Sequence, residues 1–231
     1  MKEIKTTLTA NTIFFLCCLF FFIPVGITLN QISKADSFLY LAKVHTQILD
    51  YFFSVYTFLG NGIFVISLCV ILFLLKQRQL ALCLLVGYIF TGLIAQLGKN
   101  LIYAPRPKVF FQSSGFANYM KYFTHSNSGA SSFPSGHTAS AFSVATILAF
   151  TSMKRFWGAI LFTGAFLVGY SRIYLGHHFP IDVLVGALIG VIFGAFSYQI
   201  VYNKSNWLGI LKWGKILFLR RRGRYLDTGV S

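Results

Sequence analysis

Three stretches of this sequence place ionisable side chains beside long apolar runs. The first reads Lys99-Asn100-Leu101-Ile102-Tyr103-Ala104-Pro105-Arg106-Pro107. Lys99 and Arg106 are about two helical turns apart, so both cations can project from one face of a helix. Pro105 and Pro107 should end that helix and fix the direction of Arg106. The alternative is that the two basic side chains only reach from the end of a span toward water.

The second stretch reads Phe133-Pro134-Ser135-Gly136-His137 and leads directly into an apolar run. Ser135 is a suitable N-cap, and Gly136 lets the backbone approach a ligand closely. The free N–H groups at a helix N-terminus favour a bound anion, and His137 in the first turn would lie beside it. An ordinary helix start with a hydrogen-bonded histidine is the alternative.

The third stretch runs from Ser171 to Asp182 and reads SRIYLGHHFPID. Asp182 follows His178 by four residues, close enough to accept a hydrogen bond from one imidazole nitrogen. Such a bond would fix the tautomer and leave the other nitrogen nucleophilic. Arg172 precedes this pair, and the neighbouring His177 is expected to be a plain loop residue.

The elements that must position these side chains are apolar helices. Of the 231 residues, 56% are hydrophobic and only 11% are charged, which is too few charges to cover a soluble surface. Because a membrane-spanning helix needs about 20 largely apolar residues, the sequence predicts an all-α, polytopic bundle of six transmembrane helices. They are expected near residues 11–30, 54–75, 79–98, 136–153, 155–172 and 181–202. The first run resembles a signal peptide, but its length and the runs that follow favour a retained span.

The distribution of lysine and arginine predicts the orientation of this bundle. The net charge is +15, yet the basic residues lie at the ends of apolar runs, which argues against nucleic-acid binding. With six spans, thirteen of the 20 Lys and Arg residues fall on the side of the termini and seven on the other. The positive-inside rule makes the first side cytoplasmic. The loops near residues 31–53, 99–135 and 172–182, which hold the three stretches, should therefore face outward.

The remaining segments carry less chemistry. The aromatic loop from Tyr103 to Phe133 predicts a short helix on the bilayer surface. The segment from Lys204 predicts an interfacial amphipathic helix with a basic end, or else a plain topology anchor. The chain thus divides into a membrane domain, residues 1–203, and a basic cytoplasmic tail, residues 204–231. The four cysteines lie inside apolar runs with no CxxC pair or Cys/His ligand set, so neither a disulfide framework nor a metal site is expected.

Together the three stretches resemble, in order and spacing, the signature of the phosphatidic acid phosphatase type 2/haloperoxidase superfamily. That signature is K-x6-RP, PSGH and SR-x5-H-x3-D. It is complete here as Lys99…Arg106-Pro107, Pro134-Ser135-Gly136-His137 and Ser171-Arg172…His178…Asp182. The apolar runs point to the bacterial membrane lipid phosphatase branch and away from the soluble vanadium haloperoxidases.

The resemblance implies a role for each signature residue. The phosphate would be held by five of them, Lys99, Arg106, Ser135, Gly136 and Arg172. His178 would attack phosphorus and form a phosphohistidine, and Asp182 would orient His178. His137 would protonate the leaving oxygen and then activate water. Because three fixed cations would stabilise the transferring phosphate, no metal or other cofactor is expected.

The expected function is removal of the terminal phosphate from a membrane lipid. The protein is expected in the bacterial inner (cell) membrane, with the active site facing the periplasm or exterior and the termini in the cytoplasm. Candidate substrates are undecaprenyl diphosphate, phosphatidylglycerol phosphate, phosphatidic acid and the phosphates of lipid A, with a slight preference for the polyprenyl diphosphate or a broad specificity. Phosphotransfer to a lipid acceptor would use the same residues and stays open. A non-catalytic transporter or scaffold is disfavoured because such a protein would normally lack some of these residues.

Overall fold

The structure is a computed structural model, and it describes residues 12–114, 131–152 and 156–202. Within these ranges the chain forms helices and no strand, so the predicted all-α class is confirmed. The elements are α2 (Thr12–Gln31), α3 (Lys34–Leu41), α4 (Gln47–Tyr56), the 3₁₀ turn η1 (Thr57–Gly60), α5 (Gly62–Leu74), α6 (Arg78–Leu101), α7 (Pro107–Ser113), α8 (Gly136–Thr151), α9 (Trp157–Tyr174) and α10 (Pro180–Tyr202). The predicted tail from Lys204 lies outside the described residues.

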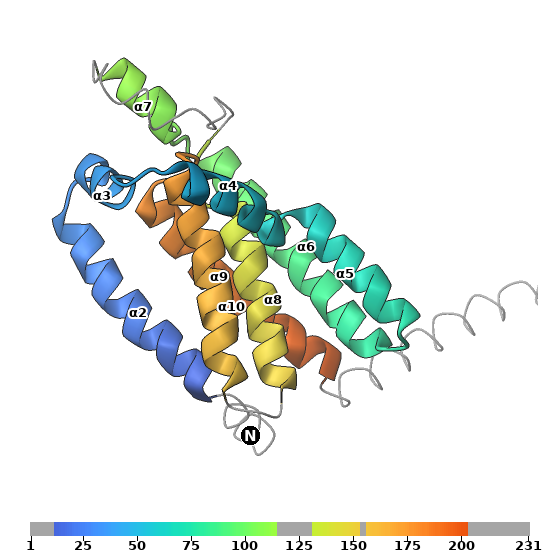
Figure 1. Cartoon of the computed structure of the whole chain (residues 1–231). Coiled ribbons are helices and arrows are strands. Elements are labelled where there is room, and N and C mark those ends of the chain that lie inside the picture. The colour runs from blue at the N-terminus through green and yellow to red at the C-terminus, as the bar shows by residue number, and fades with distance from the viewer. Residues whose placement is uncertain (1–11, 115–130, 153–155, 203–231) are drawn as a thin grey trace, which may run out of the picture.

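The long helices stand side by side as a bundle, with α8, α9 and α10 in its middle, α2 on one flank and α5 with α6 on the other (Figure 1). Three of them, α2, α6 and α10, are long and apolar enough to cross a membrane. The bent pair of α4–η1 and α5 adds a fourth if it is one span. Helices α8 and α9, with 16 and 18 residues, occupy the positions of two predicted spans. The chain is a multi-pass membrane protein, and the number six stays a prediction.

The predicted span at residues 54–75 is not one continuous helix. The chain bends by 55° between α4–η1 and α5. Asn61 starts α5 as its N-cap, and its side chain accepts a hydrogen bond from the amide of Ile63. Gly60 lies against α8, where an added Cβ would be 2.7 Å from the carbonyl oxygen of His137. The break brings η1 against the helix that carries His137.

Helices α8 and α10 pack closely because small residues line their contact. Gly186, Gly190 and Gly194 recur on one face of α10, where each approaches the backbone of α8 or the segment before it. A Cβ at Gly190, for example, would lie 2.5 Å from the carbonyl oxygen of Ala139. In a membrane, such close backbone approach is a main source of helix association. The packing fixes the start of α10 relative to the start of α8.

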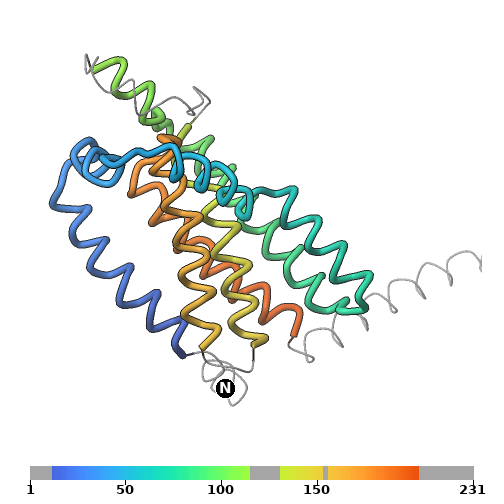
Figure 2. Tube along the Cα trace, viewed as in Figure 1, coloured from blue at the N-terminus to red at the C-terminus, as the bar shows by residue number. Residues whose placement is uncertain are grey.

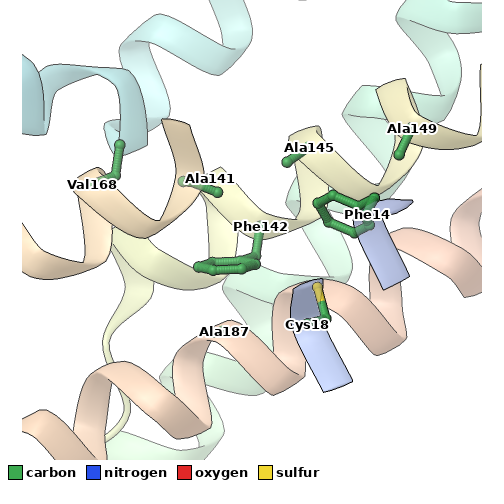
Figure 3. Close-up of a cluster of buried hydrophobic side chains, with 9 residues drawn as sticks. Phe14, Cys18, Ala141, Phe142, Ala145, Ala149, Val168 and Ala187 are labelled. Carbon is green, nitrogen blue, oxygen red and sulfur yellow. The ribbon is translucent and has the colours of Figure 1, made fainter. Parts of the chain in front are cut away.

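Aromatic and small apolar side chains fill the space between α2 and the central helices. Figure 3 shows Phe14 and Cys18 of α2 beside Phe142 of α8, with Ala187 of α10 nearby. These buried residues form one cluster with five others, Ala141, Ala145, Ala149, Ala165 and Val168. The cluster holds α2 against the bundle.

Short helices cover the end of the bundle where α6 finishes and α8 and α10 begin. Helices α3 and α4 run across this end, and α7 projects beyond it (Figures 1 and 2). Phe38 of α3, Phe111 of α7 and Phe179 beside α10 meet there in a buried aromatic cluster. The helix expected in the aromatic loop is therefore present as α7, and its place on a bilayer surface stays a prediction.

Candidate active site

The three predicted stretches meet at this end of the bundle, which we call the signature end. The C-terminal end of α6 contacts the second stretch, since a Cβ on Gly98 would lie 2.6 Å from Cδ of Pro134. The amide of Ser135 donates a 3.0 Å hydrogen bond to the carbonyl oxygen of Asp182, which joins the second stretch to the third. All eight signature side chains or amides predicted for the site therefore lie on neighbouring segments.

Lys99 and Arg106 do not share one helix, and the expectation that they project from a common helical face is wrong. Helix α6 ends at Leu101, and Ile102 has an extended backbone. Pro105 and Pro107 push the residues before them out of the helical conformation. Arg106 accordingly has φ −66° and ψ 156° and is the N-cap of α7. The prolines end the helix as expected, and the two cations reach the site from separate elements.

The three predicted phosphate-binding cations converge despite their mutual repulsion. Lys99 interacts electrostatically with both Arg106 and Arg172. Arg172 is buried, and one of its terminal nitrogens donates a 2.9 Å hydrogen bond to Thr57 of η1. The Nε atoms of Arg106 and Arg172 are buried, and neither has a hydrogen-bond partner among the residues that the structure describes. Buried donors without a partner are costly, and an anion between these groups would satisfy them.

The start of α8 combines an N-cap serine with a glycine that has room beside it among the described residues. Ser135 occupies the N-cap position, but its Oγ lies 2.8 Å from Oγ1 of Thr138 and makes no cap bond to the helix amides. The predicted side-chain cap is therefore wrong, although the position is right. Among the described residues, a Cβ built on Gly136 would meet nothing within 4 Å, and the neighbouring His137 is half-buried.

His178 and Asp182 are brought together, but not by a direct hydrogen bond. Nδ1 of His178 lies 3.7 Å from Oδ2 of Asp182, and both side chains are almost fully buried. The same carboxylate oxygen accepts 2.5 Å and 2.9 Å hydrogen bonds from the Ser132 hydroxyl and the amide of Phe179. Oγ of Ser132 also lies 3.3 Å from His178 Nδ1. The carboxylate and a serine hydroxyl together face one side of the imidazole.

Burial governs the charge of the histidines in the turn before α10. It lowers the pKa of His178 to about 4, while the contact with Asp182 opposes that shift. His177 is also buried, and burial together with the Arg172 charge lowers its pKa to about 3. Both imidazoles are neutral near pH 7, the form required of a nucleophile. His177 lies in the turn as expected, but its burial is unlike that of a plain loop residue.

Two residues of the site were missed by sequence reasoning. Thr57 contacts Arg172 from 115 residues away, and Ser132 contacts Asp182 from 50 residues away. Neither belongs to the three-part signature. Ser132 stands only three residues before Ser135, so its closeness to the second stretch was the one available signal.

Comparison with known proteins identifies the family of this chain. The model of the PAP2 superfamily matches residues 80–206, more than half of the chain. The lipid A 4'-phosphatase of Porphyromonas gingivalis is 32% identical over 182 residues, which are 76% of each chain. The chain belongs to the PAP2 superfamily, as its three-part signature predicted. Within that superfamily it is a membrane lipid phosphatase.

Two further similarities cover most of the bundle. The putative undecaprenyl-diphosphatase YbjG of Escherichia coli is 30% identical over 149 residues, covering 63% of this chain and 70% of that protein. The crystal structure of Aquifex aeolicus LpxE superposes with a TM-score of 0.59 at 34% identity, covering 70% of this chain and 92% of that one. The solved structure thus shares both the fold and a substantial part of the sequence.

Proposed function

We propose that this protein hydrolyses a phosphate ester or diphosphate of an envelope lipid through a phosphohistidine intermediate. The observation that carries the proposal is the arrangement at the signature end. Two buried arginine Nε donors have no partner in the described part of the chain, and a buried neutral histidine lies beside a carboxylate. Such a site binds an anion strongly and presents a nucleophile to it.

In the first step, Lys99, Arg106 and Arg172 hold the non-bridging oxygens of the phosphate. Because Nδ1 of His178 faces Asp182, Nε2 is the nitrogen that attacks phosphorus in line. The P–N bond forms as the bond to the leaving oxygen breaks, and His137 gives its proton to that oxygen. Asp182 stabilises the positive charge on the phosphorylated imidazole.

In the second step, the neutral His137 takes a proton from water, and the water oxygen attacks phosphorus. The P–N bond breaks, and His178 returns to its neutral form as inorganic phosphate leaves. The donors that held the phosphate in the first step hold it again, since the charge on its oxygens is similar in both transition states. No metal ion is needed to balance that charge.

The surroundings of the site favour a lipid as the carrier of this phosphate. Leu101 and Tyr103, which lie between Lys99 and Arg106 in the sequence, expose 82% and 84% of their surface. Large exposed apolar side chains beside a cationic site suit a substrate with an anionic headgroup and apolar chains. The substrate would therefore enter the site sideways from the bilayer.

Among the candidate lipids, we propose a lipid A phosphate as the preferred substrate. The relative that matches 76% of this chain is named a lipid A 4'-phosphatase, whereas the similarity to the putative undecaprenyl-diphosphatase covers 63%. This ordering changes the slight preference for a polyprenyl diphosphate drawn from the sequence, and that lipid remains the second candidate. Phosphotransfer to a lipid acceptor remains the alternative reaction.

The test is a panel of four lipids in detergent micelles with the purified protein: lipid A, undecaprenyl diphosphate, phosphatidylglycerol phosphate and phosphatidic acid. Released inorganic phosphate is measured for each, with and without added acceptor lipid. The proposal expects phosphate release without an acceptor and the highest kcat/KM for lipid A. Release only in the presence of an acceptor would identify a phosphotransferase, and no turnover of any lipid would contradict an enzymatic function.

We further propose that the signature end faces the periplasm or exterior. Arg78 begins α6 at the opposite end of the bundle. The distribution of lysine and arginine predicts that this end faces the cytoplasm. A cysteine introduced at Ser114, in a background without the four native cysteines, should react with a membrane-impermeant thiol reagent in spheroplasts. A cysteine at Thr228 should react only after lysis, and the reverse pattern would overturn the orientation.

A further inference from the structure

The hydroxyl of Ser132 contacts the side chains of both His178 and Asp182. The side chain of Ser132 is fully buried. The hydroxyl lies 2.5 Å from Oδ2 of Asp182 and 3.3 Å from Nδ1 of His178. The direct distance from Nδ1 to Oδ2 is 3.7 Å, beyond the range of an N–H···O hydrogen bond. The serine oxygen therefore spans a gap that the histidine and the carboxylate do not close by themselves.

The chemistry of the three groups assigns the proton of the imidazole. An ionised carboxylate only accepts hydrogen bonds, so the Ser132 hydroxyl must donate to Asp182. A hydroxyl has one proton, and its oxygen is then left as an acceptor toward His178. Nδ1 of His178 must accordingly carry the N–H, which leaves the lone pair on Nε2.

The main chain holds Ser132 in this place. Its amide donates a 2.7 Å hydrogen bond to the carbonyl oxygen of Ala104, in the first signature stretch. The neighbouring Ser131 fixes the same segment through a different set of bonds, because its hydroxyl contacts the carbonyl of Ile102 and the amide of Ala104. Ser131 thus anchors the backbone, and only Ser132 reaches the histidine.

We infer that Ser132 is a positioning residue of this phosphatase, whose hydroxyl bridges Asp182 to His178 and selects the tautomer that attacks phosphorus through Nε2. The inference rests on the proposed phosphohistidine mechanism. Ser132 acts on the orientation of the nucleophile and does not touch the phosphate. Its removal should lower the rate of the chemical step and leave anion binding nearly intact.

The test compares Ser132→Ala with Ser132→Thr and with the matched control Ser131→Ala, using lipid A in detergent micelles. If wild-type protein hydrolyses another panel lipid faster, that lipid is used. For Ser132→Ala, kcat should fall by about a hundredfold, as expected for a misplaced nucleophile. The inhibition constant of inorganic phosphate, which reports on the anion site, should change by less than about twofold. Ser132→Thr keeps the hydroxyl and should recover most of the rate.

Ser131→Ala should show the opposite pattern, because Ser131 holds the segment that leads to Arg106. We expect a lower melting temperature and weaker phosphate inhibition with a smaller loss of kcat. Wild-type kcat in Ser132→Ala would overturn the inference, as would parallel losses of kcat and phosphate binding that Ser132→Thr does not recover. If the alanine variant does not fold, Ser132→Cys keeps the side-chain size with a weaker donor. It should then show reduced kcat, and wild-type kcat would again overturn the inference.

The same assay distinguishes a failure of the role of Ser132 from a failure of the phosphohistidine mechanism. His178→Ala is measured alongside the serine variants. Turnover by His178→Ala would defeat the phosphohistidine mechanism itself. Loss of turnover by His178→Ala together with wild-type kcat in Ser132→Ala would defeat the role of Ser132 alone.

Discussion

The amide of Ser135 donates a 3.0 Å hydrogen bond to the main-chain carbonyl oxygen of Asp182. This bond joins the segment that begins α8 to the first turn of α10. It sets the helix N-terminus beside His137 at a fixed place relative to the His178–Asp182 pair. The two halves of the proposed mechanism, nucleophile and general acid, are therefore tied together through the backbone.

This junction depends on the absence of a side chain at Gly186. A Cβ there would lie 2.5 Å from the carbonyl oxygen of Ser135, so Gly186→Ala should push α10 away from the start of α8. We expect a loss of about 1–3 kcal/mol in stability, typical of overpacking, together with reduced turnover. Thermal unfolding in detergent and phosphate release measure the two effects.

Gly92 provides the matched control for this substitution. It lies in α6, and a Cβ at that position meets none of the described residues within 4 Å. Gly92→Ala should leave activity unchanged and hold or slightly raise the melting temperature, since alanine favours a helix. Equal effects of the two substitutions would show that close packing at Gly186 does not support the site.

The contact between Thr57 and Arg172 predicts a defect in phosphate binding. Thr57→Val keeps the side-chain shape but removes the acceptor of the 2.9 Å hydrogen bond from Arg172. Hydrogen bonds to charged groups are worth roughly 1.5–3 kcal/mol, so inhibition by inorganic phosphate should weaken by about tenfold or more. Thr57→Ser retains the hydroxyl and should behave as wild type. An unchanged inhibition constant for phosphate in Thr57→Val would show that η1 does not contribute to phosphate binding.

The depressed pKa of His178 predicts how stability depends on pH. The folded protein holds this pKa at about 4, chiefly through burial, whereas the ordinary value is 6.5. As the pH falls below about 6.5 the unfolded chain takes up the proton first, so the folded state loses stability between about pH 6.5 and pH 4. The total loss from this group is on the order of 3 kcal/mol.

Thermal unfolding in detergent from pH 7.5 to pH 4.5 checks this dependence. His178→Gln stays neutral over the whole range, so its melting temperature should fall less steeply than that of the wild type. His177→Gln should reduce the slope as well, because burial also lowers the pKa of His177. Parallel curves for the wild type and both variants would show that these histidines titrate normally in the folded protein.

The sequence predicts which residues come together at the signature end, but not every detail of the helices around them. Ser135, His137, His178 and Asp182 could be proposed from the sequence because they stand at characteristic short spacings, and the structure brings their segments together. The bounds of α8, α9 and α10 were also close to expectation, since long apolar runs leave few alternatives. The break after Gly60 was not expected from the sequence, because it depends on a tertiary contact between Gly60 and the backbone of His137.

The residues that support the site show the same limit. Thr57 and Ser132 are ordinary polar residues in the sequence, and only the folded chain brings them to Arg172 and to the His178–Asp182 pair. The expectation of a direct histidine–carboxylate bond failed for a related reason. Four residues of spacing permit that contact, but the side chain of Ser132 enters the gap from another segment.

Removal of metal ions by a chelator tests whether positively charged side chains compensate the negative charge of the phosphate. The proposed mechanism uses Lys99, Arg106 and Arg172, which EDTA does not remove. Phosphate release should therefore continue at more than about half its initial rate in excess EDTA, since the transition-state charge stays compensated. Adding magnesium to the chelated enzyme should have no effect. Complete loss of activity that magnesium restores would identify a metal-dependent enzyme.

The central claim is that His178 carries the phosphate during turnover. Brief reaction with a lipid labelled in its terminal phosphate, followed by denaturing quench, should trap labelled protein. The label should be stable in alkali and labile in acid, as a phosphohistidine is. His178→Ala should trap no label and lose at least about a thousandfold in turnover, as expected when one member of a catalytic unit is removed. Labelled wild-type protein with an acid-stable bond, or near-normal turnover in His178→Ala, would contradict the mechanism.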